Sequence, residues 1–203
     1  MTILGMMQGM RVAAVVAVGV ALAGCTGTMF TSNYSSMRDA GYTLPSVPLD
    51  KLPSKYHRQV VKYATGEKPG TIIVDTSEKH LYFVMADGKA MRYGIGVGRE
   101  GFTWSGTNRI TRKAEWPGWT PPPQMIRREA ARGVTLPAHM PGGLRNPLGA
   151  RALYIGSTIY RIHGSPEWNS IGRNVSSGCI RMINQDIIDL YNRAEVGAKV
   201  IVK

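Results

Sequence analysis

The segment from His163 to Met182 contains the side chains best suited to covalent chemistry. Cys179 is a candidate nucleophile, but a free thiol is mostly protonated at neutral pH and needs a base or a cation beside it. His163 is the candidate base, and Gly164 after it lets the chain turn and leave the imidazole ring exposed. Gly178 permits close approach of a substrate backbone, and the N–H groups of Gly178 and Cys179 can point together at an oxyanion. This pattern predicts a candidate cysteine nucleophile with a histidine as its base.

Arg181 follows Cys179 by two residues, so on an extended segment both side chains face the same way. A guanidinium in that place can bind a substrate carboxylate as a two-pronged fork. Other interpretations exist for each residue. A lone cysteine in an apolar stretch is commonly a small buried hydrophobe, and a lone histidine at the end of a strand is commonly structural.

The elements that must position these residues are mostly strands. Alternating and β-branched runs predict strands, Asp87 and Gly88 predict a hairpin turn, and the prolines between residues 116 and 123 exclude a regular element there. Two helices are expected, of which the second has an apolar stripe and Asn184 as its N-cap. The sequence therefore predicts a mainly β domain with a few short helices. The expected strands cover 71–76, 80–86, 89–98, 107–113, 151–156, 158–163 and 198–203, and the expected helices cover 124–132 and 184–194.

The first residues resemble a targeting signal. An apolar run at 12–23 follows Arg11 and ends in Leu-Ala-Gly-Cys, which resembles the bacterial lipobox and marks Cys25 for lipidation. The alternative is a plain secretory signal with an incidental cysteine. We therefore expect a lipoprotein-type signal peptide at 1–24, a tether rich in Pro, Ser and Thr at 25–68 with a short helix at 54–63, and a catalytic domain at 69–203. An exported protein of the cell envelope or periplasm is expected, held in the outer membrane if the cell is Gram-negative.

The net charge of the chain indicates which kinds of binding partner to expect. With 25 Lys and Arg against 13 Asp and Glu, the formal net charge is +12. Outside the cytoplasm such a surface favours an anionic wall polymer or membrane, and the chain carries no pattern typical of nucleic-acid binding. His57, His80 and His139 have no partners at ligand spacing, so no metal is expected. The run GIGVG at 94–98 lacks the helix and acidic partner of a dinucleotide site, so no cofactor is expected either.

The residues between His163 and Arg181 resemble the motif of a known family. His163-Gly164 followed by Ser-Ser-Gly-Cys-Ile-Arg at 176–181 resembles the YkuD-type L,D-transpeptidase catalytic domain, whose pattern is His-Gly, a spacer and Ser/Thr-x-Gly-Cys-x-Arg/Asn. Supporting similarities occur at 94–101, 112–125, 146–149 and 152–156, so that the resemblance spans roughly 70–203. It implies a β-sandwich-type catalytic domain.

The resemblance also implies a substrate and roles. Members of this family act on peptidoglycan stem peptides, which are the expected partners, and they are acylated by carbapenems. Cys179 is then the nucleophile, His163 the proton acceptor and donor, and Gly178 part of the oxyanion site. Ser176 either orients His163 or only shapes a turn. Further candidate substrate-binding residues are Arg181, Gly164, Ser177, Tyr154 and Trp168, although each aromatic ring could equally be core packing.

Two departures from the family pattern are visible. Ser177 stands where the family often has a histidine, so His163 must be the base, and residues 102–107 replace a common Thr-Pro-x-Gly loop. Three rival functions remain open. Hydrolysis of the same acyl-enzyme would make an L,D-carboxypeptidase or amidase, and a basic lipoprotein could bind the wall without catalysis. A papain-like peptidase is disfavoured because its cysteine precedes its histidine. Nothing in the sequence requires more than a monomer.

Overall fold

The computed structural model describes Met1, residues 34–99 and residues 104–203. The predicted signal peptide, Cys25 and part of the 102–107 loop lie outside these residues. No helix in the described part of the chain is long and apolar enough to cross a membrane. The helices are α1 (Pro123–Ala130), α2 (Asn184–Arg193) and two short 3-10 turns, η1 (Ser54–Tyr56) and η2 (Trp168–Ser170). The strands are β1 (Met37–Asp39), β2 (Tyr42–Leu44), β3 (Gln59–Lys62), β4 (Ile72–Asp75), β5 (His80–Val84), β6 (Lys89–Gly94), β7 (Val97–Gly98), β8 (Gly106–Glu115), β9 (Arg151–Ile155), β10 (Arg161–Ser165), β11 (Asn174–Ser176), β12 (Ile180–Ile183) and β13 (Lys199–Val202).

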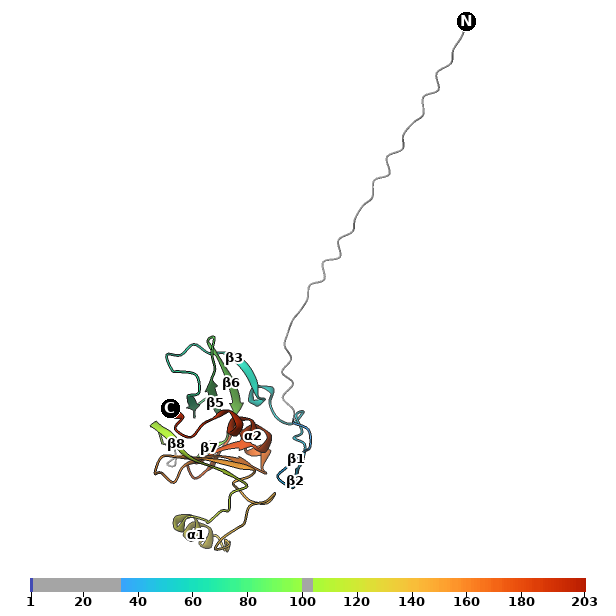
Figure 1. Ribbon diagram of the computed structural model, residues 1–203. Coiled ribbons are helices and arrows are strands. Elements are labelled where there is room, and N and C mark those ends of the chain that lie inside the picture. Colours follow the sequence, from blue (N-terminus) through green and yellow to red (C-terminus); the bar gives the residue numbers. More distant parts are fainter. Residues whose placement is uncertain (2–33, 100–103) are drawn as a thin grey trace.

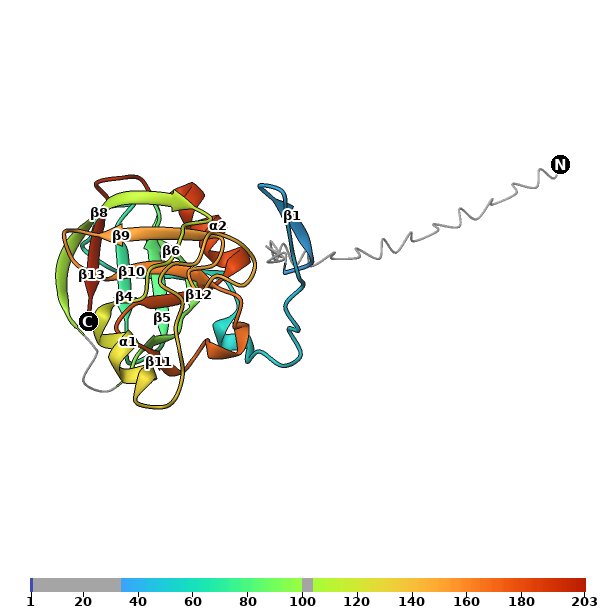
Figure 2. The ribbon, with the colours of Figure 1, turned by 90° about the horizontal axis from the view of Figure 1, so that it is seen from below.

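Nine of these strands form one strongly curved sheet in the order β12-β10-β9-β8-β13-β4-β5-β6-β3 (Figures 1 and 2). Strand β8 makes the curvature possible. Its first part pairs with β13 and its second part with β9, with an irregularity between Ile110 and Arg112. Such an irregularity bends a strand and increases its twist. The two ends of the sheet then face each other, and Arg181 of β12 exchanges backbone hydrogen bonds with Gly96 beyond β6.

Because the sheet curves, its two halves face each other as two layers, with β4, β5 and β6 in one and β9, β10 and β12 in the other. The main core fills the space between these layers. Alternate residues of one layer, such as Ile72 and Leu81, meet alternate residues of the other, such as Ile162 and Ile180. Helix α2 packs its apolar stripe, including Ile187, against the same core. The prediction of a mainly β domain with a few short helices and a sandwich-type core is confirmed.

Residues 34–68 are not a free tether, which corrects the expectation for this part of the chain. They form the β1–β2 hairpin, η1 and β3, and β3 pairs antiparallel with β6 at the edge of the large sheet. The helix expected at 54–63 is only the η1 turn followed by β3. The short run of Val60 and Val61 finds an apolar partner on the sheet edge, and no local pattern could reveal that partner.

Arg58 and Tyr34 fasten this segment to α2. The Tyr34 hydroxyl donates to Asp186 Oδ2 at 3.0 Å, and Arg58 Nη1 lies 3.7 Å from Asp186 Oδ1 and 3.6 Å from Asp189 Oδ2. Asp186 is 0% exposed, and burial raises its pKa to about 7. The charge of Arg58 opposes that shift and so favours the ionised form of Asp186.

Replacing Arg58 by alanine is expected to lower the free energy of unfolding by about 2 kcal/mol, because it removes the cation beside Asp186 and Asp189 and the hydrogen bond to the Gln185 carbonyl oxygen. In a domain of this size the melting temperature should fall by about 4 to 8 °C. Urea unfolding followed by circular dichroism measures the change, with the exposed Arg38→Ala on the same segment as the control. Equal stability of the two variants would show that this segment does not contribute to the fold.

Helix α2 begins differently from the prediction. Asn184 is its first helical residue and not its N-cap, which is Ile183. The Asn184 Oδ1 atom instead accepts a hydrogen bond from the Ala150 N–H at 2.9 Å, so the side chain joins α2 to the loop before β9. Strand β10 runs from Arg161 to Ser165, later than the expected 158–163, and β11 and β12 were not expected as strands.

Candidate active site

Cys179 and His163 meet in a cavity of about 190 Å³ on the outer face of β10 and β12. These strands are parallel, with Ile162 opposite Ile180 and His163 opposite Arg181. Because side chains alternate along a strand, Ile162 and Ile180 point into the core while their neighbours point outward. The outward positions Arg161, His163, Cys179 and Arg181 all line the cavity. The parallel pairing therefore brings together residues that are separated in the sequence.

The His163 ring is buried, being 4% exposed, which corrects the expectation of an exposed ring. The long segment between β8 and β9 covers the face of β10 on which this ring lies, with residues such as Trp119 and Leu148. Nδ1 lies 2.6 Å from the Gly164 carbonyl oxygen. A carbonyl only accepts, so Nδ1 carries the proton and donates it to Gly164, and Nε2 keeps its lone pair. Burial, with the charges of Arg181 and Arg161 acting in the same direction, lowers the pKa of His163 to about 4. The imidazole is thus a neutral base at physiological pH.

Burial also sets the state of the cysteine. It raises the pKa of the Cys179 thiol above its ordinary value, while hydrogen bonding and charge from Arg161 and charge from Arg181 oppose that rise. The Sγ atom lies 3.9 Å from the carbonyl oxygen of Ile159. The resting pair is therefore a neutral thiol and a neutral imidazole. Such a pair must form the thiolate by proton transfer as the reaction starts.

The turn before Cys179 is built by Ser176. Its hydroxyl donates to the Cys179 carbonyl oxygen at 2.5 Å and accepts from the Gly178 N–H at 3.2 Å. Gly178 has a φ of +104°, a conformation that residues with a side chain rarely adopt. The ring of His163 is held by Gly164 and not by Ser176. The structure thus gives Ser176 the turn role among the two that the sequence left open.

Arg181 and Ser177, two candidates for substrate binding, line the cavity, and each has a polar partner. Arg181 Nη1 lies 2.7 Å from Glu167 Oε2, on the exposed rim. Ser177 Oγ accepts a long bond of 3.4 Å from Arg128, which follows Met125 on α1. Arg181 is therefore already balanced by a carboxylate before any substrate arrives.

Gly164 does not line the cavity, which corrects its expected role in binding substrate. An added Cβ would lie 2.3 Å from Asn184 Oδ1 and 2.9 Å from Ile187 Cγ2. The residue is therefore required for the close approach of β10 to the start of α2, and it faces the core and not the substrate.

Replacing Gly164 by alanine is expected to destabilise the fold by about 2 kcal/mol, because Asn184 must move away from Ala150 to make room. Thermal unfolding measures the loss. Gly66→Ala is the matched control, since nothing lies within 4 Å of the position of its added Cβ. Unchanged stability of Gly164→Ala together with weakened substrate binding would favour the substrate role instead.

Tyr154 and Trp168, the two aromatic candidates for substrate binding, do not line this cavity. The Tyr154 ring contacts the guanidinium groups of Arg112 at 3.5 Å and Arg161 at 5.3 Å. Trp168 packs on the small cluster around Tyr56 and lines a separate cavity of about 330 Å³ beside β2. Both are thus supporting residues of the fold around the site.

The sequence interpretation missed most of the walls. Arg161 was not named, although it precedes His163 by two residues on a strand and alternation alone places it on the same face. The remaining walls come from the long segment between β8 and β9 that carries α1, which lies apart from α2 in Figure 1. Its prolines hide any periodic signal. This segment contributes Trp119, whose ring had made it a candidate for a substrate groove, and the unpredicted residues Pro122, Met125, Pro147 and Leu148. Ile159 comes from the loop before β10.

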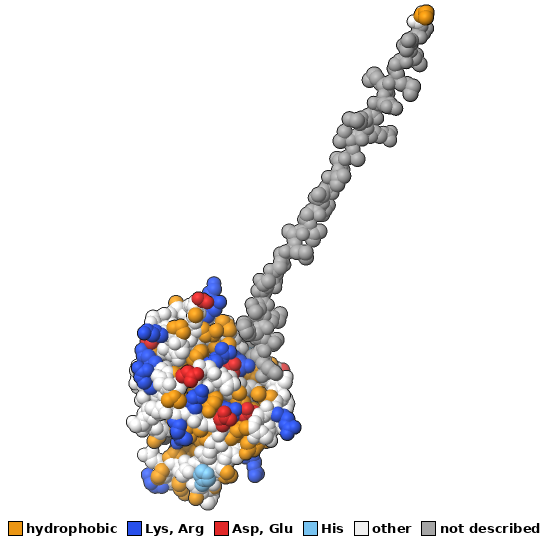
Figure 3. Space-filling model, in the orientation of Figure 1, with side chains coloured by type: hydrophobic (Ala, Val, Ile, Leu, Met, Phe, Trp, Pro, Cys, Tyr) orange, Lys and Arg blue, Asp and Glu red, His pale blue; other side chains and the backbone are white. Residues whose placement is uncertain are grey.

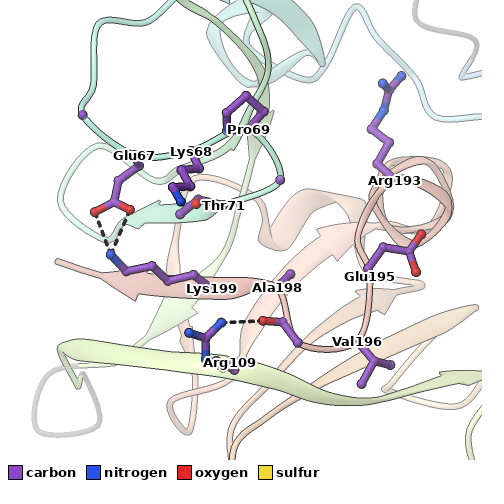
Figure 4. A pocket seen from close by; sticks show the side chains of 13 residues that line it. Glu67, Lys68, Pro69, Thr71, Arg109, Arg193, Glu195, Val196, Ala198 and Lys199 are labelled. Atoms are coloured by element: carbon purple, nitrogen blue, oxygen red, sulfur yellow. Dashed lines mark hydrogen bonds and ion pairs between the residues drawn. The ribbon is translucent and has the colours of Figure 1, made fainter.

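A larger cavity of about 910 Å³ lies between the 66–71 loop and the 195–199 segment (Figure 4). Two of its cationic side chains have partners within the protein. Lys199 binds both oxygens of Glu67 at 2.8 Å, and Arg109 donates to the Gly197 carbonyl oxygen at 2.9 Å. It contains no thiol or imidazole. Within the described ranges no group of three potential metal ligands occurs.

The basic charge is not gathered at one place on the visible face. Figure 3 shows Lys and Arg side chains scattered among polar and apolar ones over the domain, with acidic side chains between them. This distribution fits broad electrostatic attraction to an anionic surface better than one focused binding patch on that face.

Comparisons with known proteins identify the family of this chain. Residues 69–202 match the YkuD family, described as the L,D-transpeptidase catalytic domain. The probable L,D-transpeptidase ErfK/SrfK of Escherichia coli K12 is 41% identical over 134 residues, which cover 64% of this chain and 42% of that protein. The chain thus spans less than half the length of this curated relative.

Solved structures show the same fold. L,D-transpeptidase 3 of Mycobacterium tuberculosis superposes with a TM-score of 0.51 at 18% identity, over 66% of this chain and 60% of that one. A Brucella melitensis structure titled a probable carnitine operon oxidoreductase is 42% identical, with a TM-score of 0.50 over 75% of this chain and 96% of that one. Similarity at the lower identity supports the fold alone.

Proposed function

Because this chain belongs to the YkuD family of L,D-transpeptidase catalytic domains, we propose that it transfers an acyl group between peptidoglycan stems through a thioester on Cys179. The donor is a tetrapeptide stem, and the bond broken joins the L-centre of its diamino acid to the terminal D-alanine. The observation that carries the proposal is the shared cavity of Cys179 and His163, with the Nδ1 proton of His163 held by Gly164. That tautomer leaves Nε2 as the base.

Acylation begins with proton transfer. Nε2 of His163 takes the thiol proton, and Sγ of Cys179 attacks the carbonyl carbon of the diamino acid. When the tetrahedral intermediate collapses, the carbon–nitrogen bond breaks and the imidazolium gives its proton to the leaving amine of D-alanine. The products of this half-reaction are free D-alanine and the thioester.

The second half-reaction uses the same groups. An amine of a second stem, or of a protein lysine, attacks the thioester carbonyl while His163 takes its proton. The sulfur leaves as thiolate and recovers that proton from the imidazolium. If water replaces the amine, the same acyl-enzyme gives an L,D-carboxypeptidase or an amidase.

The oxyanion is assigned to the backbone N–H groups of Gly178 and Cys179. In the substrate-free protein the Gly178 N–H is bonded to Ser176 Oγ at 3.2 Å, at the long end of the normal range. A developing oxyanion is a stronger acceptor than a hydroxyl, so Gly178 exchanges one partner for the other during the reaction. Arg181 and Ser177 shape the adjoining wall of the cavity.

The proposal extends to location. A stem-peptide substrate places the enzyme in the cell envelope, consistent with a signal peptide at 1–24 and a lipid on Cys25. Only residues 25–33 then remain for the tether, since residues from 34 onward pack on the domain. The membrane anchored in this way is the outer membrane in a Gram-negative cell.

The oxidoreductase title of the Brucella relative does not suit this chain. The glycine-rich run at 94–98 forms the end of β6 and β7, and the next described element is strand β8. A dinucleotide fingerprint requires its glycines to open a helix.

The test is to incubate the full chain with a disaccharide-tetrapeptide and read the products by mass spectrometry. A cross-linked dimer that has lost one D-alanine supports transpeptidation. Tripeptide as the sole product assigns the protein to the carboxypeptidases. No turnover, together with no mass adduct from a carbapenem, would leave a wall-binding lipoprotein without catalysis.

A further inference from the structure

Arg161 occupies a defined place beside the nucleophile. Across the sheet, Arg112 of β8 pairs with Tyr154 of β9, and Tyr154 pairs with Arg161 of β10. The next strand is β12, where the parallel pairing of Ile162 with Ile180 places Cys179 next to Arg161. One row of outward side chains therefore runs over four strands and ends at the thiol.

The guanidinium group of Arg161 lacks a carboxylate partner within the described residues. Its Nε atom is buried without a hydrogen-bond partner, and no carboxylate of residues 34–99 or 104–203 forms an ion pair with it. Its planar group lies over the Tyr154 ring at 5.3 Å, which limits its orientation. By contrast, Arg181 in the same cavity is held by Glu167 at 2.7 Å. Arg161 is thus the arginine of this cavity whose charge no described carboxylate balances.

The proposed donor brings such an anion to this place. Its terminal residue carries a free carboxylate one residue beyond the attacked carbonyl, and consecutive residues are about 4 Å apart. When Sγ of Cys179 reaches that carbonyl, the carboxylate lies within reach of the neighbouring row position. Arginine binds a carboxylate through two parallel N–H···O bonds, which fixes direction as well as charge.

We propose that Arg161 binds the terminal carboxylate of the donor stem and so selects stems that end one residue after the scissile bond. This inference rests on the proposed function and assigns to Arg161 the carboxylate role that the sequence suggested for Arg181. The carboxylate stays ionic throughout and leaves with the released residue, so no covalent step involves Arg161. Tyr154 acts as a positioning residue for it.

The experiment compares two donors, a tetrapeptide with a free terminal carboxylate and the same peptide with that carboxylate converted to an amide. Release of the terminal residue is followed for the wild-type chain, Arg161→Met, Arg161→Lys and Arg112→Met. Arg112 contacts the same Tyr154 ring at 3.5 Å but does not line the cavity, so it is the matched control.

The wild-type chain is expected to prefer the carboxylate donor by about 10- to 100-fold in kcat/KM, which is the range for a hydrogen-bonded charged group. Arg161→Met should reduce this preference to near unity, Arg161→Lys should keep part of it, and Arg112→Met should keep all of it. If Arg161→Met slows both donors by the same factor, or if the wild type shows no preference, the inference is wrong.

A substrate-independent measurement separates the two proposals. Alkylation of Cys179 by iodoacetamide, with the melting temperature, reports whether each variant is folded with an accessible thiol. A folded, alkylated wild-type chain that processes neither donor overturns the proposed function and this inference with it. A folded wild-type chain that processes both donors equally overturns only the role of Arg161.

Discussion

Replacing Cys179 by alanine is expected to reduce both release of the terminal D-residue and transfer to a second stem by at least about a thousandfold, because the thioester can no longer form. Cys179 lines the cavity that also holds His163 and Arg161, and it is the free cysteine of the described residues. The remaining groups can still bind a donor, so binding and turnover should separate in this variant.

Mass spectrometry with a carbapenem checks this result directly. The wild-type chain should gain the mass of one carbapenem, and Cys179→Ala should gain none. The melting temperature of the variant should stay close to that of the wild type, since the substitution removes a single sulfur atom whose contact with the Ile159 carbonyl oxygen, at 3.9 Å, is weak. Retained transfer in a folded Cys179→Ala variant would place the nucleophile elsewhere.

Replacing His163 by asparagine is expected to slow acylation by about a hundredfold to ten-thousandfold, the range for loss of a positioned general base. The thiol pKa is raised by burial, so without the base little thiolate is available near neutral pH. Asparagine retains a side-chain donor for the Gly164 carbonyl but offers no basic nitrogen, which makes it a specific test of Nε2.

The pH dependence of the wild-type chain identifies the same residue. Burial lowers the pKa of His163 to about 4, so the neutral base is present at higher pH and is lost as the pH falls through that value. The acylation rate with a carbapenem should therefore decline near pH 4 and not near the ordinary histidine pKa of about 6.5. This acidic limb should be absent from His163→Asn. A decline centred near 6.5 would contradict the buried, neutral state of the ring.

Much of the site was predictable from local sequence, because its geometry follows from alternation. The cysteine turn with Gly178, the common face of Cys179 and Arg181, and the strand that carries His163 all depend on residues close together in the chain. Alternation along the strand also places Arg161, two residues before His163, on the same face, so the sequence could have predicted it too. The hairpin at residues 87–88 and the mainly β fold likewise rest on short-range patterns.

Predictions about partners distant in the chain were less successful. Tyr154 and Trp168 were assigned to substrate by residue type, yet what they contact is set by neighbouring strands and by the N-terminal segment. Gly164 was assigned to a turn, although its true constraint is the close approach of α2. Each of these roles depends on which element packs against the residue.

For Cys179 and His163 too, local sequence and tertiary structure determine different properties. The residue types, their spacing and the family resemblance were sufficient to propose a cysteine nucleophile and its histidine. The sequence could not predict that the imidazole would be 4% exposed and neutral, or that Arg181 would be balanced by Glu167 and Arg161 would not. Dihedral preferences and side-chain alternation act within a few residues, and so local sequence determines them. Desolvation and charge pairing depend on strands and loops that meet only when the sheet has curved, and so they are decided by the tertiary structure.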